Sequence, residues 1–139
     1  MKLKIKTYPD FGLLVIRIVL GFSYVIVHGG QKLIAGPTLW NKIGSSVGTL
    51  GINFAFTEWG FLAMCAEFFG GLLIMFGLFF RPATVFIIFT MFIAAYSTFA
   101  KGASIGTLAY PIELGITILG LFFTGPGKYS LDYHVFGRK

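Results

Sequence analysis

The sequence predicts an all-α membrane protein: a four-helix transmembrane bundle with an extra interfacial helix between the first and second spans. Of its 139 residues, 56% are hydrophobic, 18% are aromatic and only 12% are charged. The mean hydropathy is +0.84, and such a composition is typical of membrane proteins. The clearest span covers residues 61–80, because a helix of this length reaches the ~30 Å needed to cross the hydrocarbon core.

The first apolar run covers residues 11–28 and follows a basic segment. Arg17 interrupts this run and no small-residue cleavage site follows it, so we expect an uncleaved helix rather than a signal peptide. Arg17, Gly21, Tyr24 and His28 are spaced by four, three and four residues, which places them on one helix face. This polar face fits either a functional site or a packing surface, and in both cases it is expected to point toward protein.

Residues 30–60 are too polar and too rich in glycine to span the membrane. Pro37 and Thr38 give a helix-start signal, and apolar residues repeat at helical spacing after them. We therefore expect a short helix in the membrane interface, over the mouth of the bundle, with Trp40 and Trp59 near the lipid headgroups.

Two more spans, at residues 83–100 and 107–125, complete a single membrane domain of residues 1–139. Four spans place both termini on one side of the membrane, and that side carries more basic residues than the other. The positive-inside rule therefore predicts cytoplasmic termini. The basic residues on the side of the termini are Lys2, Lys4, Lys6, Arg81, Lys128, Arg138 and Lys139, and those on the opposite side are Lys32, Lys42 and Lys101.

Glu67 and Glu113 each lie six residues inside the outer end of a span, so their depths match. A carboxylate at this depth costs at least ~2.5 kcal/mol unless it faces protein or water. We expect both glutamates in one outer-side pocket, with His28 within hydrogen-bond or one-water reach of at least one of them and Lys32 nearby. Arg17 lies deeper, and its long side chain can reach up to one of the glutamates.

The last span carries a polar stripe of its own. Glu113, Thr117, Gly120 and Thr124 repeat the spacing of four, three and four residues that is found in the first span. One face of this helix is therefore polar, and we expect it to be directed into the bundle.

Structural roles are expected in the second span and in the tail. Glycines in the second span let a neighbouring backbone come close. The turn at residues 125–127 is expected to fold the tail back under the cytoplasmic helix ends, where Asp132 has Arg81 or Arg17 as its nearest cation. The residues with expected structural roles are Gly70, Gly71, Gly77, Arg81 and Asp132.

Composition and motifs narrow the range of ligands and cofactors that the chain is expected to bind. The only cysteine, Cys65, lies inside a span, so neither an internal disulfide nor a CxxC redox pair can form. The basic residues stand at the ends of apolar runs rather than in a patch, which argues against nucleic-acid binding. Haem held by two histidines is disfavoured, because His28 and His134 are expected on opposite sides of the membrane. We expect no metal, since no ligand-spacing motif supports one, and no intrinsic cofactor. Binding of a quinone or a similar small hydrophobic ligand requires only side chains that this sequence contains.

Several short motifs occur together along the chain. They are Arg17, His28-Gly29, Lys32-Leu33, Glu67, Gly70-Gly71, Gly77-Leu78, Arg81, Ala83, Glu113, Gly125-Pro126-Gly127 and Tyr129-Ser130-Leu131-Asp132. In this combination the chain resembles the DoxX family of small prokaryotic membrane proteins, from about Phe11 onward. The resemblance implies a four-helix bundle in the plasma (inner) membrane. It also implies association with redox or respiratory complexes, since the family is named for subunits of a thiosulfate:quinone oxidoreductase. It does not carry over thiosulfate chemistry, because this chain has no sulfur-handling domain and no cysteine placed as a sulfur carrier.

Three functions stay open at this point. The first is a membrane subunit of a redox or respiratory-type system that binds a quinone or similar ligand in the outer-side polar pocket. The second is a non-catalytic membrane protein that stabilises or recruits a partner, and the third is small-solute transport. The sequence does not decide whether the chain belongs to an oxidoreductase, and its candidate partners are the lipid bilayer, a protein of a redox complex and a second copy. The expected ligand-binding residues are Arg17, Tyr24, His28, Lys32, Glu67 and Glu113.

Overall fold

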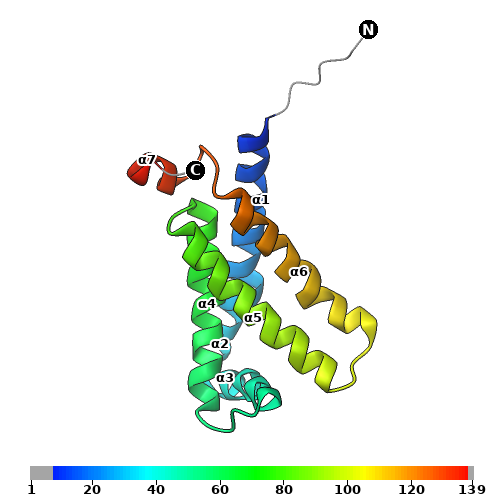
Figure 1. Cartoon of the computed structure of the whole chain (residues 1–139). Helices are drawn as coiled ribbons and strands as arrows, with labels where there is room; N and C mark the ends of the chain where they lie inside the picture. The colour runs from blue at the N-terminus through cyan, green and yellow to red at the C-terminus, as the bar shows by residue number, and fades with distance from the viewer. Residues whose placement is uncertain (1–7, 138–139) are drawn as a thin grey trace.

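The computed structural model describes residues 8–137, which are helical apart from short connections (Figure 1). Four helices are long and apolar enough to cross a membrane, which confirms the predicted all-α membrane bundle. The first of them, Pro9–Ala35, consists of α1 (Pro9–Ser23), the π-helical segment η1 (Tyr24–Gly29) and α2 (Gly30–Ala35). The others are α4 (Phe56–Phe76), α5 (Phe80–Ala100) and α6 (Ile105–Thr124).

Between the first span and α4, the chain forms α3 (Pro37–Gly44) and the 3-10 segment η2 (Ser45–Leu50). Gly36 has a φ of +71°, which lets the chain turn after α2 so that α3 can begin at Pro37. Helix α3 packs on the start of α4 so closely that a Cβ on Gly60 would overlap the Trp40 carbonyl. We call this end of the bundle the α3 end, and the opposite end, where α1 begins and α6 ends, the terminal end (Figure 1).

Helix α4 is the centre of the bundle, because it packs against the first span, α3 and α5, while α6 packs on α5. The double glycine of α4 serves two of these contacts. Gly71 lies against Tyr24 of the first span, where a Cβ would sit 2.7 Å from the tyrosine Cβ, and Gly70 lies against Ile87 of α5. The hydrophobic core forms around these contacts and takes in Ile118 from α6.

After α6 the chain folds back across the terminal end, as the turn at residues 125–127 predicts, and forms α7 (Leu131–Phe136). Figure 1 shows α7 beside the junction of α4 and α5. The tail also meets the start of α1, since the backbone N–H of Lys128 donates to Asp10 at 3.0 Å. The two ends of the described chain are therefore held together at the terminal end.

Asp132 is the main link between the tail and the helices. Its carboxylate accepts hydrogen bonds from the backbone N–H groups of Phe79 and Phe80, both at 2.9 Å, at the start of α5. Asp132 thus caps the start of α5, because the free N–H groups of a helix start attract a carboxylate. Arg81 instead lies over the ring of Phe122, 5.9 Å from its centroid. Asp132 forms no ion pair within residues 8–137, although its charge acts on Arg17.

The cap makes Asp132 a test of the tail's contribution to stability. Asp132→Ala should lower the free energy of unfolding by about 1–2 kcal/mol, because two N–H groups lose their acceptor. Denaturant titration in detergent micelles measures this change. Glu58→Ala is the matched control, since Glu58 is an exposed acid in the first turn of α4 and should cost no more than ~0.5 kcal/mol. Equal losses in both variants would contradict the capping role.

Candidate functional site

A buried ion pair joins the first span to α4 near the α3 end. The Nζ atom of Lys32 lies 2.5 Å from Oε2 of Glu67. The Glu67 side chain is 2% exposed and that of Lys32 is 20% exposed. Burying a carboxylate is costly unless a cation pairs with it. Lys32 is therefore what allows Glu67 to lie inside the bundle.

The π-helical segment explains how Lys32 comes to face Glu67. Residues Tyr24–Gly29 form wider turns than an α-helix, and such segments are frequent at functional sites. The residues beyond this segment are therefore rotated from the positions that α-helical periodicity assigns to them. Gly29 lies directly against the backbone of Phe68, where no Cβ would fit. This close approach puts Lys32, one turn later, beside Glu67.

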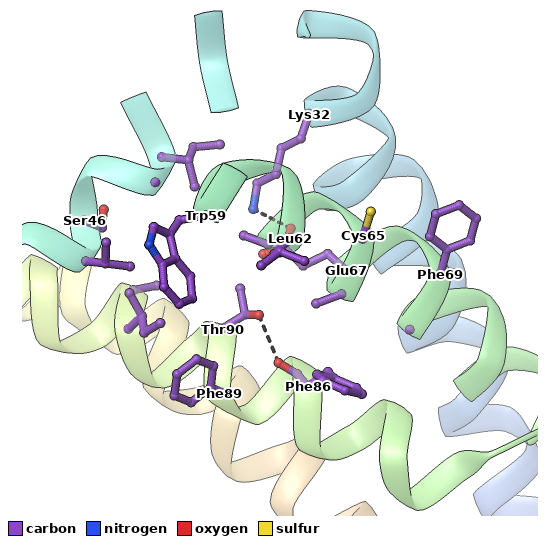
Figure 2. Close-up of a pocket in the computed structure, with 18 of the residues that line it drawn as sticks. Lys32, Ser46, Trp59, Leu62, Cys65, Glu67, Phe69, Phe86, Phe89 and Thr90 are labelled. Carbon is purple, nitrogen blue, oxygen red and sulfur yellow. Dashed lines mark hydrogen bonds and ion pairs between the residues drawn. The ribbon is translucent and has the colours of Figure 1, made fainter. Parts of the chain in front are cut away.

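A cavity of about 560 Å³ lies next to the ion pair, between α4 and α5 (Figure 2). Its walls are mostly apolar, and residues of α3 and η2 close it at the α3 end. Lys32, Glu67, Trp59 and Thr90 supply polar groups to its lining. The Thr90 hydroxyl donates to the Phe86 carbonyl, whereas the buried indole N–H of Trp59 has no partner among residues 8–137. The Lys32 ammonium, paired with Glu67, is thus the nitrogen donor that borders the cavity, whereas Nε1 of Trp59 is enclosed.

Three phenylalanines place part of the cavity wall at the surface of the bundle. Phe69, Phe86 and Phe89 line the cavity and are 54%, 62% and 53% exposed. In a multi-pass protein these side chains face the acyl chains of the lipid. A molecule dissolved in the bilayer can therefore reach the cavity from the side, between α4 and α5.

A second polar cluster contains Tyr24, His28 and Tyr110. The Tyr110 hydroxyl lies 2.8 Å from a ring nitrogen of His28, and the rings of Tyr24 and His28 are 5.3 Å apart between centroids. Tyr24 is completely buried, and its hydroxyl has no partner in the described part of the chain. His28 therefore hydrogen-bonds directly to a tyrosine, and its expected reach to a glutamate through one water stays a prediction.

Glu113 does not join Glu67 within the chain. Its side chain is exposed and does not line the cavity. Helix α6 turns Pro111, Ile118 and Leu121 toward the core instead, and the rest of the α6 polar stripe is exposed as well. The expected shared pocket and the inward-facing stripe are thus wrong for a single chain. Matching depth does not fix the rotation of a helix, and the face of α6 that packs is an apolar one without Glu113.

Arg17 lies at the terminal end, away from the ion pair. It is 0% exposed, and its Nη2 donates to the Tyr129 carbonyl in the tail at 2.6 Å. Gly77 provides the space for the guanidinium, since a Cβ there would overlap Nη1. Nε and Nη1 have no partner among the residues that the structure describes. Arg17 therefore contacts the tail and does not reach up to either glutamate.

Two residues of these clusters, Trp59 and Tyr110, are not among the ligand-binding residues that the sequence predicts, and Trp59 is expected only near the lipid headgroups. Trp59 lines the cavity together with Ala63, Ala66 and Gly70, and their spacing of four, three and four residues is a signal for one helix face with small side chains. Tyr110 stands one turn before Glu113 on the α6 stripe, but nothing in its spacing shows that it meets His28.

These features define a small multi-pass membrane protein with a ligand-sized apolar cavity beside a buried Lys–Glu pair. Among residues 8–137, no group of three His, Cys, Asp or Glu side chains is placed to hold a metal ion. The sequence profile of the DoxX family matches residues 12–100, and the chain belongs to this family. The Escherichia coli (strain K12) protein named "Inner membrane protein YqjF" is 35% identical over 135 residues, which cover 91% of this chain and 94% of that protein. No solved structure matches the chain.

The ion pair gives a direct test of the site. Lys32→Met leaves Glu67 buried without a partner and should lower the free energy of unfolding by about 3 kcal/mol. The double variant Lys32→Met/Glu67→Leu removes both charges and should recover most of this loss. Unfolding in mixed micelles measures Lys32→Met, Glu67→Leu and the double variant against the unsubstituted protein. Lys101→Met, at an exposed lysine, is the control. Additive losses for the two positions would show that their side chains do not interact.

Proposed function

We propose that the chain is an integral membrane subunit of a redox or respiratory-type system that binds a quinone, or a similar small hydrophobic ligand, between α4 and α5. The observation that carries this proposal is an apolar cavity of about 560 Å³ that ends at a buried ion pair. Small-molecule sites typically have volumes of about 300–1,000 Å³, apolar walls and a few polar groups that orient the ligand.

The polar groups of the cavity suit a ligand with carbonyl oxygens. A quinone ring offers two acceptor oxygens on an otherwise apolar body. The Lys32 ammonium is a donor in the cavity wall, and Glu67 holds Lys32 in position. A bound quinone would supply two-electron chemistry, while this chain would bind the ring and orient it. The lateral opening beside Phe69 and Phe86 fits a ligand that arrives from the bilayer.

The family membership and the named relative support a location in the inner membrane of a prokaryote. We place the termini in the cytoplasm, because Arg81 and Lys128 belong to the terminal end and the basic residues of the sequence are more numerous on that side.

A second candidate function, recruitment of a membrane partner, is favoured by a different observation. Glu113 is exposed on α6, inside a span. An ionisable side chain there calls for a contact outside the chain. The two functions are compatible, because the cavity and the exposed face of α6 use different residues.

Ligand binding can be tested through the single cysteine. Cys65 lines the cavity, so a short-chain benzoquinone bound there should slow its reaction with a membrane-permeant maleimide, measured by mass spectrometry in nanodiscs. Protection should saturate as the quinone is titrated. Glu67→Gln should weaken it about tenfold, because the amide holds Lys32 less firmly than the carboxylate does.

Two further variants separate cavity binding from general partitioning into lipid. Ala94→Phe should abolish protection, because Ala94 lines the cavity and a phenyl ring would fill part of it. Val85→Phe adds the same ring to α5 at a position that is 50% exposed and outside the cavity lining, so it should keep full protection. Unchanged labelling at all quinone concentrations, together with no quinone in gently extracted protein, would refute the ligand-binding proposal.

Orientation is tested by reporter fusions. A green fluorescent protein joined to the C-terminus should fluoresce, and an alkaline phosphatase at the same place should be inactive, because both report a cytoplasmic end. An alkaline phosphatase inserted after Gly102, in the loop between α5 and α6, should be active. The reverse pattern would place the termini and the terminal end outside the cytoplasm.

A further inference from the structure

The wall of the cavity between α4 and α5 carries no net charge. Among residues 8–137, Lys32 and Glu67 are the charged side chains that line it, and each neutralises the other, because Nζ lies 2.5 Å from Oε2. The other polar side chains of the lining include Ser46, Trp59 and Thr90, which are uncharged. The ion pair therefore offers a ligand a hydrogen-bond donor and an acceptor, but no free charge.

An anionic headgroup would find no counter-ion in this wall. Lys32 already has a carboxylate at hydrogen-bond distance, so a second carboxylate or a phosphate would lie beside the like charge of Glu67. The Glu67 side chain is buried, so water screens this repulsion poorly. A charge that is buried without its own counter-ion is strongly disfavoured. A cationic headgroup meets the same obstacle, because Lys32 already lies at Glu67.

The cavity has a polar side and an apolar side that borders the lipid. Figure 2 shows Lys32 and Glu67 on one side of the cavity, and Phe86 and Phe89 on the opposite side. Both phenylalanines are more than half exposed, and in the membrane their rings meet acyl chains. A ligand can therefore place a small polar head at the ion pair and leave an apolar tail near these rings. Its head must suit a wall without net charge.

We infer that the cavity selects electrically neutral ligands, with an uncharged carbonyl group at the head and an apolar tail, over fatty acids and acidic phospholipids. This inference rests on the proposed ligand-binding function and specifies the class of its ligand. The Lys32 ammonium has three N–H groups, so it can donate to a carbonyl oxygen while it stays paired with Glu67. Glu67 sets the selectivity, because its charge cancels the positive charge that would otherwise attract an anion.

Two compounds with the same ring and tail separate the charge of a ligand from its shape. At mildly alkaline pH, 4-decylacetophenone is neutral, whereas 4-decylbenzoic acid is ionised. Each is titrated into phosphatidylcholine nanodiscs that contain the unsubstituted protein, and protection of Cys65 from the maleimide is compared at equal measured mole fractions in the lipid. The ketone should protect at a mole fraction about tenfold lower than the acid, because only the acid brings an uncompensated charge to the ion pair.

Glu67→Gln tests which residue sets the selectivity. This substitution leaves the Lys32 ammonium without its carboxylate, so the acid should bind better and the ketone worse. The ratio of the two protecting mole fractions should shift toward the acid by about tenfold or more. Glu58→Gln is the matched control, because Glu58 is an exposed acid of α4 outside the cavity lining. It should keep the ratio of the unsubstituted protein.

The short-chain benzoquinone distinguishes failure of this inference from failure of the proposed function. If the quinone protects Cys65 and the acid protects as well as the ketone, the cavity binds ligands but does not select neutral ones. If neither the quinone nor the ketone protects, both proposals are refuted. An unchanged ratio in folded Glu67→Gln would overturn the role of Glu67, and the unfolding midpoint shows whether that variant is folded. The comparison in the unsubstituted protein decides the selectivity even if it is not.

Discussion

The structure depends on one constraint: an ionisable side chain cannot face hydrocarbon without compensation. Each such residue deep in the bundle meets this constraint in a different way. Glu67 is compensated by Lys32 in the extended first span, and Arg17 is compensated in part by the tail, where its Nη2 donates to the Tyr129 carbonyl. Glu113 has no ion pair within the described chain. The charges of Glu67 and Arg17 thus fix the contacts of the first span and the fold of the tail.

The ion pair and the cavity share one structural origin, the small-residue faces of α4. Gly71 admits the first span on one side, and this contact lets Lys32 reach Glu67. Ala63, Ala66 and Gly70 lie on the cavity side, where α5 supplies the opposite wall. Small side chains on that side leave space that Phe86 and Phe89 border but do not fill. The small residues on two faces of α4 therefore account for both the buried ion pair and the cavity beside it.

Much of the fold follows from the sequence, because hydropathy and glycine–proline signals act locally. The four spans, the helix that begins at Pro37 and the folded-back tail belong to this group. The site is harder to predict, since it depends on helix rotation and on contacts between distant segments. The π-helix at Tyr24–Gly29 shifts the helix register away from the one that a constant 100° per residue predicts. The composition of this segment does not signal a π-helix. The rotation of α6 is set by packing of Ile118 and Leu121, so that equal depth of Glu67 and Glu113 carries no information on whether they meet.

The hydrogen bond between Arg17 and Tyr129 has a consequence for the order of events during synthesis. The two residues are 112 positions apart, so the ribosome completes the first span long before it makes the group that accepts from the arginine. The first helix must therefore enter the membrane while Arg17 is still without this acceptor, held near the interface by its long side chain. Final packing at the terminal end, including the cap on α5, can form only after translation of the tail. The bundle therefore completes its packing after membrane insertion, when the tail comes into contact with the first span.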